Sequence, residues 1–367
     1  MEVIVATDQV SESLDAAFMC PRLTCLDLSY LPNLRNFYAQ GQKLEWPYLH
    51  QLDIDGCGEI EILEKKVSSS SEIHGEESAI DSKYPLLSCN KDDRVSYNLF
   101  SNFKKLVVYG CGFVILVPFQ VLRSLHSLEE LTVNKCEELE VVFDLEDLND
   151  CKERQSSSVV LPLKKLWLWS LPKLKNVWSN HHGENVCFQS LSQIHVSLCD
   201  SLTSVFPASI AKGMLHCLEQ LEVRKCADME VIVATDQVSE SLDAAFVCPR
   251  LTSLKLFGLP NLRNFYAQTQ KLEPRHLVSC GETEIFEKEV SCSAEIHGEE
   301  STIDSKYPLL SCNKDDRFSN NLFSNLKKLV VDGCGFVILV PFQVLRSLHS
   351  LEKLQVKTVR SWKWCLI

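Results

Sequence analysis

The chain has 367 residues, 45% of them hydrophobic and 23% charged, a composition typical of a folded protein. Its formal net charge of −12 argues against general binding to nucleic acids or anionic membranes, since both need clustered Lys and Arg. The longest uncharged apolar run, at residues 112–119, is far shorter than the roughly 20 residues that a membrane helix needs. The N-terminus lacks the basic start of a secretory signal peptide, so we expect a soluble, cytoplasmic protein with no membrane span.

A repeated unit is clearest at Leu218–Ile232, where the sequence follows L-x-x-L-x-[LVI]-x-x-C-x-x-[LM]. The alternating apolar residues of its first half predict a short strand, and Cys226 marks the turn into a return segment. This is the leucine-rich-repeat pattern, in which stacked units share one continuous core. The sequence therefore predicts an α/β repeat solenoid. We expect a horseshoe with a parallel β-sheet on its concave face and irregular or short helical segments on its convex face.

Units of this kind recur along the whole chain in two forms. One has Cys after the strand, and the other has Leu-Pro there, as in Leu163–Leu174. In chain order, the clear units begin at Leu23, Leu49, Phe103, Leu128, Leu163, Leu191, Leu218 and Leu251. Polar insertions interrupt the array at about residues 64–98, 144–160 and 287–321, and we expect the first to be an exposed loop with little fixed structure.

The array contains an internal duplication, because residues 1–18 recur identically as residues 229–246. We divide it into a first copy (1–134), unique repeats (135–228), a second copy (229–356) and a divergent tail (357–367). The offset between the copies falls from 228 to 223, so the second copy lacks residues from the middle of a strand near 274–280. We expect that this repeat does not form properly. Both ends of the sequence fall within a repeat and lack polar caps, which predicts a fragment or truncated gene product.

The cysteines do not follow the pattern of a disulfide framework. Their number, 17, is odd, and no C-x-x-C spacing indicates a zinc or redox site. Many occupy the same repeat position: Cys57, Cys111, Cys136, Cys199, Cys226 and Cys334. We expect these thiols to stay reduced and to form a buried column of small apolar side chains with weak donor groups.

No motif in the sequence indicates catalysis. The phosphate-binding pattern G-x-x-x-x-G-K-[ST], the hydrolase elbow G-x-S-x-G and the zinc motif H-E-x-x-H are all absent. His181 and His182 have no nearby ligand at metal-binding spacing, and the duplicated His74 and His297 lie in polar loop sequence. We therefore expect a protein that is not an enzyme and needs no cofactor or metal.

Residues between the core positions of each strand project onto the concave face of such a solenoid. In chain order these are Cys25, Asp27, Gln51, Asp53, Lys105, Val107, Glu130, Thr132, Lys165, Trp167, Gln193, His195, Gln220, Glu222, Ser253, Lys255, Lys328 and Val330. Their charges are mixed, which predicts no uniform field over the face.

Near the middle of the array, Trp167 and Trp169 form an apolar patch beside Lys164 and Lys165. Because exposed Trp is enriched at binding hot spots, this patch is the expected centre of a protein-binding surface. The candidate residues are Lys165, Trp167, Trp169, His195, Glu222 and Lys255. The alternative is that loops or the next repeat cover both indoles.

The alternation of the two repeat forms resembles the leucine-rich-repeat region of plant coiled-coil nucleotide-binding leucine-rich-repeat (NBS-LRR) disease-resistance proteins. Leu128–Val142 has the Cys form, and Leu163–Leu174 and Leu251–Leu262 have the Leu-Pro form. The resemblance covers nearly the whole chain outside the insertions. It implies a horseshoe that senses pathogen effectors in plant innate immunity, directly or through a guarded host protein, and that restrains an attached nucleotide-binding domain.

The sequence departs from that family because the coiled coil and the nucleotide-binding domain are missing from it. The expected function is therefore protein recognition alone, with an effector, a guarded host protein or the nucleotide-binding domain of a full-length receptor as partner. Two alternatives remain open. One is the substrate-recruiting leucine-rich-repeat subunit of a ubiquitin ligase, and the other is a non-functional truncated gene product.

Overall fold

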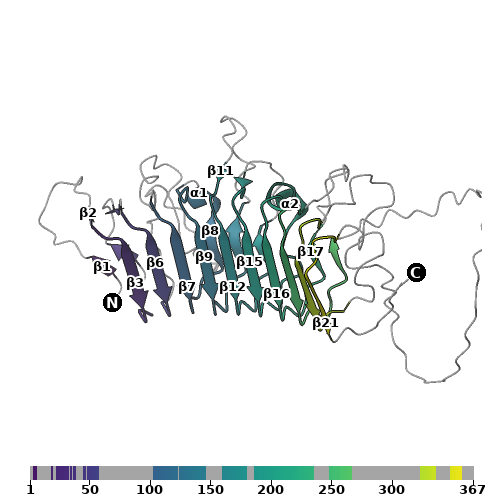
Figure 1. Ribbon diagram of the computed structural model, residues 1–367. Helices are drawn as coiled ribbons and strands as arrows, with labels where there is room; N and C mark the ends of the chain where they lie inside the picture. The colour runs from purple at the N-terminus through teal and green to yellow at the C-terminus, as the bar shows by residue number, and fades with distance from the viewer. Residues whose placement is uncertain are drawn as a thin grey trace, which may run out of the picture.

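The computed structural model describes most of the repeat array. The described residues are 22–57 without 33, 35, 39–43 and 47, then 102–145 without 123, 159–179, 186–234, 248–266, 323–335 and 348–357, together with 3–5 and 18–19. These residues form a solenoid of stacked repeats, and the fold prediction is confirmed (Figure 1). The duplicated His74 and His297, the pair His181 and His182, and most of the three polar insertions lie outside them, so the expected domain boundaries stay predictions.

A ten-stranded parallel sheet, which we call the main sheet, runs the length of the solenoid in chain order. Its strands are β3 (Cys25–Ser29), β6 (Gln51–Asp55), β7 (Lys105–Tyr109), β9 (Glu130–Asn134), β12 (Lys165–Trp169), β15 (Gln193–Ser197), β16 (Gln220–Arg224), β18 (Ser253–Phe257), β20 (Lys328–Asp332) and β21 (Lys353–Lys357). The second and fourth residues of the inner strands, such as Leu166 and Leu168, are buried, because the side chains of a strand alternate between its two faces.

The chain leaves each of the first nine strands through the same sharp turn. The residue after the strand has a φ between 49° and 65°, and at five turns it is not Gly. The residues at this position are Tyr30, Gly56, Gly110, Lys135, Ser170, Leu198, Lys225, Gly258 and Gly333. Its N–H still donates to the next strand, as that of Ser170 does to the Ser197 carbonyl at 2.8 Å. The positive φ therefore turns the chain toward the core without losing a sheet hydrogen bond.

The two repeat forms fold into the same turn. Cys226 is buried, and the N–H of Met229 donates to its carbonyl at 3.3 Å. Leu171 occupies the same place, and the N–H of Leu174 donates to its carbonyl at 3.2 Å. Pro172 suits the second residue of this turn because its φ is already set for it.

The expected column of buried cysteines is present. All six cysteines at the repeat position are buried: Cys57, Cys111, Cys136, Cys199, Cys226 and Cys334. They are free thiols, and the Cys226 Sγ lies 3.3 Å from the Arg224 carbonyl. Burial raises the pKa of Cys111 to about 12, so this thiol stays protonated at neutral pH.

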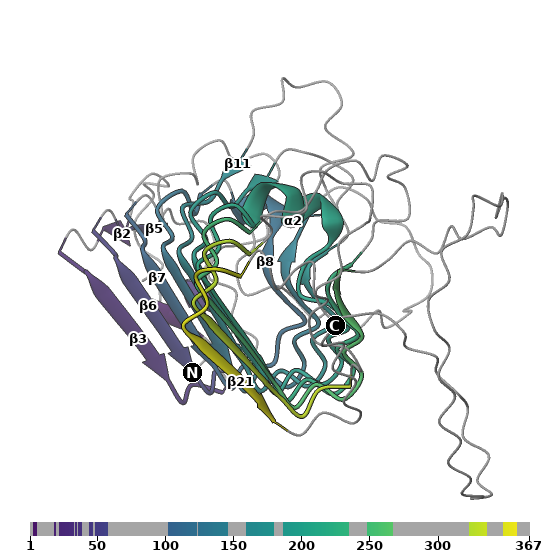
Figure 2. The same cartoon turned by 45° about the vertical axis from the view of Figure 1, so that its right-hand side comes forward.

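The return segments contain more β-structure than expected. They carry two short helices, α1 (Phe119–Leu122) and α2 (Ala208–Met214), but also short parallel strands across the core from the main sheet (Figure 2). These strands are β8 (Ile115–Pro118), β10 (Val141–Asp144) and β13 (Asn176–Trp178) in one sheet, and the pairs β1 (Val3–Val5) with β4 (Asn36–Tyr38) and β17 (Val231–Val233) with β19 (Asn264–Tyr266). Two further pairs, β2 (Phe18–Met19) with β5 (Leu44–Glu45) and β11 (Val159–Val160) with β14 (Val186–Cys187), come just before main-sheet strands in the chain, and β2 and β5 lie beside the starts of β3 and β6 (Figure 2).

Large aromatic side chains of the return segments and of the segments near them pack together in the core. Trp178 stacks on Phe206, with ring centroids 5.4 Å apart and an interplanar angle of 16°, and its centroid lies 6.3 Å from that of Phe143. Phe188 packs edge-on against Trp178 at 5.9 Å. All four are buried, so consecutive repeats are joined through an aromatic core as well as through their sheets.

The main sheet passes directly from β18 to β20 in the second copy. Their equivalents in the first copy, β3 and β7, are separated by β6. β18 and β20 are therefore direct neighbours, whereas β3 and β7 are not. As a result, Gly335 lies against Pro260, where an added Cβ would come within 1.8 Å of the Pro260 carbonyl oxygen.

Candidate protein-binding surface

Trp167 and Trp169 lie on β12, the fifth strand from the β3 end of the main sheet, and project away from the core. They are 48% and 51% exposed, so the described part of the chain leaves about half of each indole uncovered. Both occupy alternate positions of one strand and so share a face of the sheet. Within the described residues, neighbouring repeats therefore do not bury these two indoles.

His195, on β15, is the cross-strand neighbour of Trp167. Its imidazole stacks with both indoles: the centroid distances are 5.8 Å to Trp167 and 6.4 Å to Trp169, with interplanar angles of 29° and 19°. The three rings form one aromatic cluster, which we call the Trp-His cluster. Stacking restricts the rotamers of the indoles and presents their exposed area as a stable surface.

Burial lowers the pKa of His195. The charge of Glu222 opposes this shift, and the charges of Arg224 and Lys255 add to it. The imidazole is therefore neutral at pH 7, and its contact with the Glu222 carboxylate, 3.9 Å away, is not an ion pair at that pH. The aromatic cluster carries no charge of its own.

A charge network borders the cluster toward the β21 end of the main sheet. The Glu222 carboxylate binds Lys255 Nζ at 2.8 Å and also pairs with Arg224. Burial alone would raise the pKa of Glu222, but the Lys255 hydrogen bond lowers it, as do the charge that His195 acquires at acidic pH and the charges of Lys255 and Arg224. Glu222 is therefore ionised, and the network has one more cation than carboxylates.

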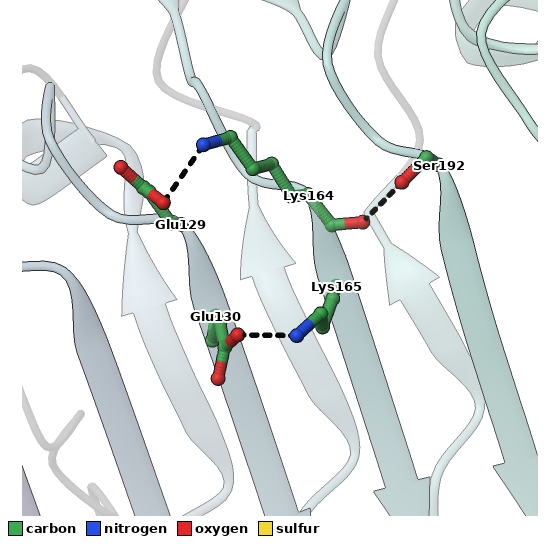
Figure 3. Close-up of polar contacts among 5 residues, drawn as sticks. All are labelled: Glu129, Glu130, Lys164, Lys165 and Ser192. Carbon is green, nitrogen blue, oxygen red and sulfur yellow. Dashed lines mark hydrogen bonds and ion pairs between the residues drawn. The ribbon is translucent and has the colours of Figure 1, made fainter.

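On the β3 side, ion pairs connect β9 with β12 (Figure 3). Lys165 Nζ lies 2.6 Å from Glu130 Oε1, and Lys164 Nζ lies 2.8 Å from Glu129 Oε2. On the other flank, the Ser192 hydroxyl donates to the Lys164 carbonyl at 3.3 Å. These lysines are half exposed, so each pair contributes only about 0.2–1 kcal/mol to stability. Their main effect is to neutralise the border of the Trp-His cluster.

The structure brings the candidate residues together on four adjacent strands, β12, β15, β16 and β18. They are Lys165, Trp167, Trp169, His195, Glu222 and Lys255. Sequence reasoning missed the contribution of Arg224, the last residue of β16. The sequence spacing could have predicted this contribution, because Arg224 is two residues after Glu222 and so lies on the same face of the strand.

No three His, Cys, Asp or Glu side chains gather into a metal-binding group within the described ranges. Neither described helix is long and apolar enough to cross a membrane. The Trp-His cluster presents exposed aromatic area with charged groups at fixed positions around it. This arrangement suits the binding of an apolar or aromatic group.

Comparison with protein families agrees with this architecture. The family described as "Plant disease resistance protein RPS2-like, leucine-rich repeats" matches residues 75–216 and 298–364, more than half of the chain. The chain belongs to this family. Searches among curated proteins and among solved structures gave no match. The resemblance to plant disease-resistance proteins is thus confirmed at the level of the leucine-rich-repeat region. Repeat regions of this type generally mediate protein interactions.

Proposed function

We propose that this RPS2-like repeat region recognises a protein in plant innate immunity, with the Trp-His cluster at the centre of the contact. The partner is a pathogen effector or a host protein that an effector modifies, and recognition takes place in the cytoplasm without catalysis or a cofactor. A full-length receptor of this family would couple such recognition to a nucleotide-binding domain. That the chain is a fragment lacking this domain stays a prediction.

The observation that carries this proposal is the exposure of two neighbouring Trp side chains in the middle of the main sheet. Leaving so much indole area in water is unfavourable, at roughly 25 cal/mol per Å² of apolar surface. Covering it with a partner releases this free energy, which is why central Trp side chains account for much of the affinity in many interfaces. The family match favours an immune role over the ubiquitin-ligase alternative.

The test compares three purified proteins as bait in extracts of infected plant tissue: wild type, Trp167→Ala plus Trp169→Ala, and Tyr48→Ala. Tyr48 is a suitable control because it is an aromatic residue of similar exposure, 54%, outside the main sheet. We expect quantitative mass spectrometry to find a specific partner with wild type and Tyr48→Ala and to lose it with the double variant. Equal recovery by all three proteins, each shown to be folded by circular dichroism, would contradict the proposal.

A further inference from the structure

The charges on the exposed face of the main sheet are separated along the solenoid. At one end, β3 and β6 present the carboxylates of Asp27, Asp53 and Asp55 and no cation. Within the described part of the chain, the side chains of Ser29 and Gln51 donate to Asp27 and Asp53, and no ion pair neutralises them. This end of the face is therefore acidic.

The opposite end is basic. The exposed positions of β16, β18, β20 and β21 carry five cations and two carboxylates. The cations are Arg224, Lys255, Lys328, Lys353 and Lys357, and the carboxylates are Glu222 and Asp332. The sequence predicted a face with mixed charges and no uniform field, and in space those charges are ordered rather than interspersed.

Between these ends lies a nearly neutral segment. On β7, β9, β12 and β15 the charged residues at exposed positions are Lys105, Glu130 and Lys165, and the last two neutralise each other at 2.6 Å. The remaining exposed positions of β12 and β15 include the Trp-His cluster. Along the axis of the solenoid, the exposed face is thus acidic at β3 and β6, aromatic at β12 and β15, and basic from β16 to β21.

The spacing is large enough for the two ends to act independently. Neighbouring strands are about 4.8 Å apart, which puts β6 about 14 Å from β12 and β20 about 19 Å from β12 on its other side. Both distances exceed the screening length of about 8 Å at physiological ionic strength. A charge held over one end therefore responds mainly to that end.

We propose that the partner of this surface is a protein segment with an apolar or aromatic anchor over Trp167 and Trp169, basic side chains toward β6 and acidic side chains toward β20. This inference rests on the proposed function and adds the chemistry and orientation of the partner. Complementary charges at both ends favour this orientation, and a partner turned around would place like charges together at both ends. The polarity of the face therefore selects a bipolar partner over one of uniform charge.

The test uses two synthetic peptides of about 13 residues, the length that spans the main sheet in an extended conformation. One carries a Lys run, a Phe- and Leu-containing centre and a Glu run; the other has the same composition and centre but alternates Lys and Glu on both sides. Isothermal titration calorimetry with the full chain should show roughly tenfold tighter binding of the bipolar peptide at low salt. This preference should disappear at about 0.5 M salt. Equal affinities at low salt, or no binding of the bipolar peptide, would overturn the proposal.

Charge reversal at the acidic end provides the matched variant. Asp27→Lys plus Asp53→Lys makes both ends basic, so the bipolar peptide should bind roughly tenfold more weakly and a peptide with Glu runs at both ends should bind best. The control, Asp228→Lys plus Glu230→Lys, changes net charge equally at exposed positions outside the main sheet and should leave the preference unchanged. An equal effect of both variants would mean that total charge decides, which overturns the proposal.

Two further outcomes separate this inference from the proposed function. In the first outcome, wild type binds both peptides equally and the variant Trp167→Ala plus Trp169→Ala binds neither. Recognition through the Trp-His cluster is then supported, and the proposal of a bipolar partner is wrong. If the double variant binds both peptides as wild type does, the cluster is not the contact and both ideas fail. A salt-sensitive dimer in analytical ultracentrifugation without peptide would assign the surface to a second copy of the chain and overturn the bipolar partner.

Discussion

The first and second copies of the duplicated sequence build the main sheet differently. Within the described residues, the first copy contributes four adjacent strands, β3, β6, β7 and β9, and the second contributes β18, β20 and β21. β7 and β20 begin with the same four residues, Lys-Leu-Val-Val, but β7 pairs with β6 and β20 pairs with β18. Both pairings place equivalent positions opposite each other.

This difference shows which parts of a repeat can be exchanged. A strand accepts a new neighbour because the register depends on backbone hydrogen bonds and on the alternation of apolar residues, which all units share. The turns are more specific. Gly112 in the first copy and Gly335 in the second copy are equivalent residues. An added Cβ at Gly335 would meet Pro260, whereas an added Cβ at Gly112 would have no atom within 4 Å. The change of neighbouring strand therefore alters the contacts of the turns more than the pairing of the strands.

The largest expected effect compares Leu131 with its equivalent in the second copy, Leu354. Leu131 is fully buried in β9, whereas Leu354 in β21, the last strand of the sheet, is 44% exposed. Leu131→Ala should lower the free energy of unfolding by about 2–5 kcal/mol through lost burial and a cavity. Leu354→Ala should cost below about 1 kcal/mol. Urea unfolding followed by circular dichroism measures both, and similar costs would show that β21 is as well packed as β9.

The next comparison tests the contact created between the turns. Gly335→Ala should destabilise the protein by about 1–3 kcal/mol, because the new methyl group would overlap the backbone carbonyl of Pro260 and force the two turns apart. Gly112→Ala should change stability by less than about 0.5 kcal/mol. Melting temperatures of the two variants give the difference. A harmless Gly335→Ala would mean that β20 does not stack directly on the β18 repeat.

A smaller effect is expected at the residue that follows the strand, Tyr30 in the first copy and Gly258 in the second. Their φ angles are 55° and 60°, a conformation that costs a residue other than Gly about 1–2 kcal/mol. Gly258→Ala should therefore be destabilising. Tyr30→Gly should be stabilising by about 0.5–1 kcal/mol, since the greater freedom of Gly in the unfolded chain offsets part of the gain. Opposite shifts in the urea midpoint are the expected result, and shifts of the same sign would contradict it.

Most of the main sheet could be predicted from local spacing. The pattern L-x-x-L-x-L defines which side chains are buried, and the Cys or Leu that follows defines the turn, so both the strands and the column of thiols were evident. The short strands behind the core were not, because runs such as Val141–Phe143 are too short to show a period. Nor was the positive φ at Leu198 and Lys135, since the turn is imposed by the next repeat rather than by those residues.

The candidate surface was predictable in its residues but not in its contacts. Trp167 and His195 hold the same position in successive units, so their adjacency follows from the repeat register. The stacking of His195 on Trp169 as well, and the sharing of Glu222 between Arg224 and Lys255, depend on side-chain rotamers that a repeat pattern does not contain. The direct pairing of β18 with β20 likewise places Lys255 beside Val330, which only the three-dimensional structure reveals.

The smallest expected effect concerns a charge that differs between the copies. In the first copy Lys105 lies opposite Glu130, whereas in the second Lys328 lies opposite Lys353, a like-charge pair. Lys353→Glu restores the first arrangement and should stabilise the protein by about 0.2–1 kcal/mol at low salt.

Lys357→Glu is the matched control for Lys353→Glu, because it makes the same charge change on the same strand but opposite Asp332. It replaces an attractive pair with a repulsive one and should therefore destabilise the protein by a similar amount. Salt at about 0.5 M should remove most of both shifts in melting temperature. If both variants shift the melting temperature in the same direction, net charge rather than the cross-strand partner determines the stability of this edge.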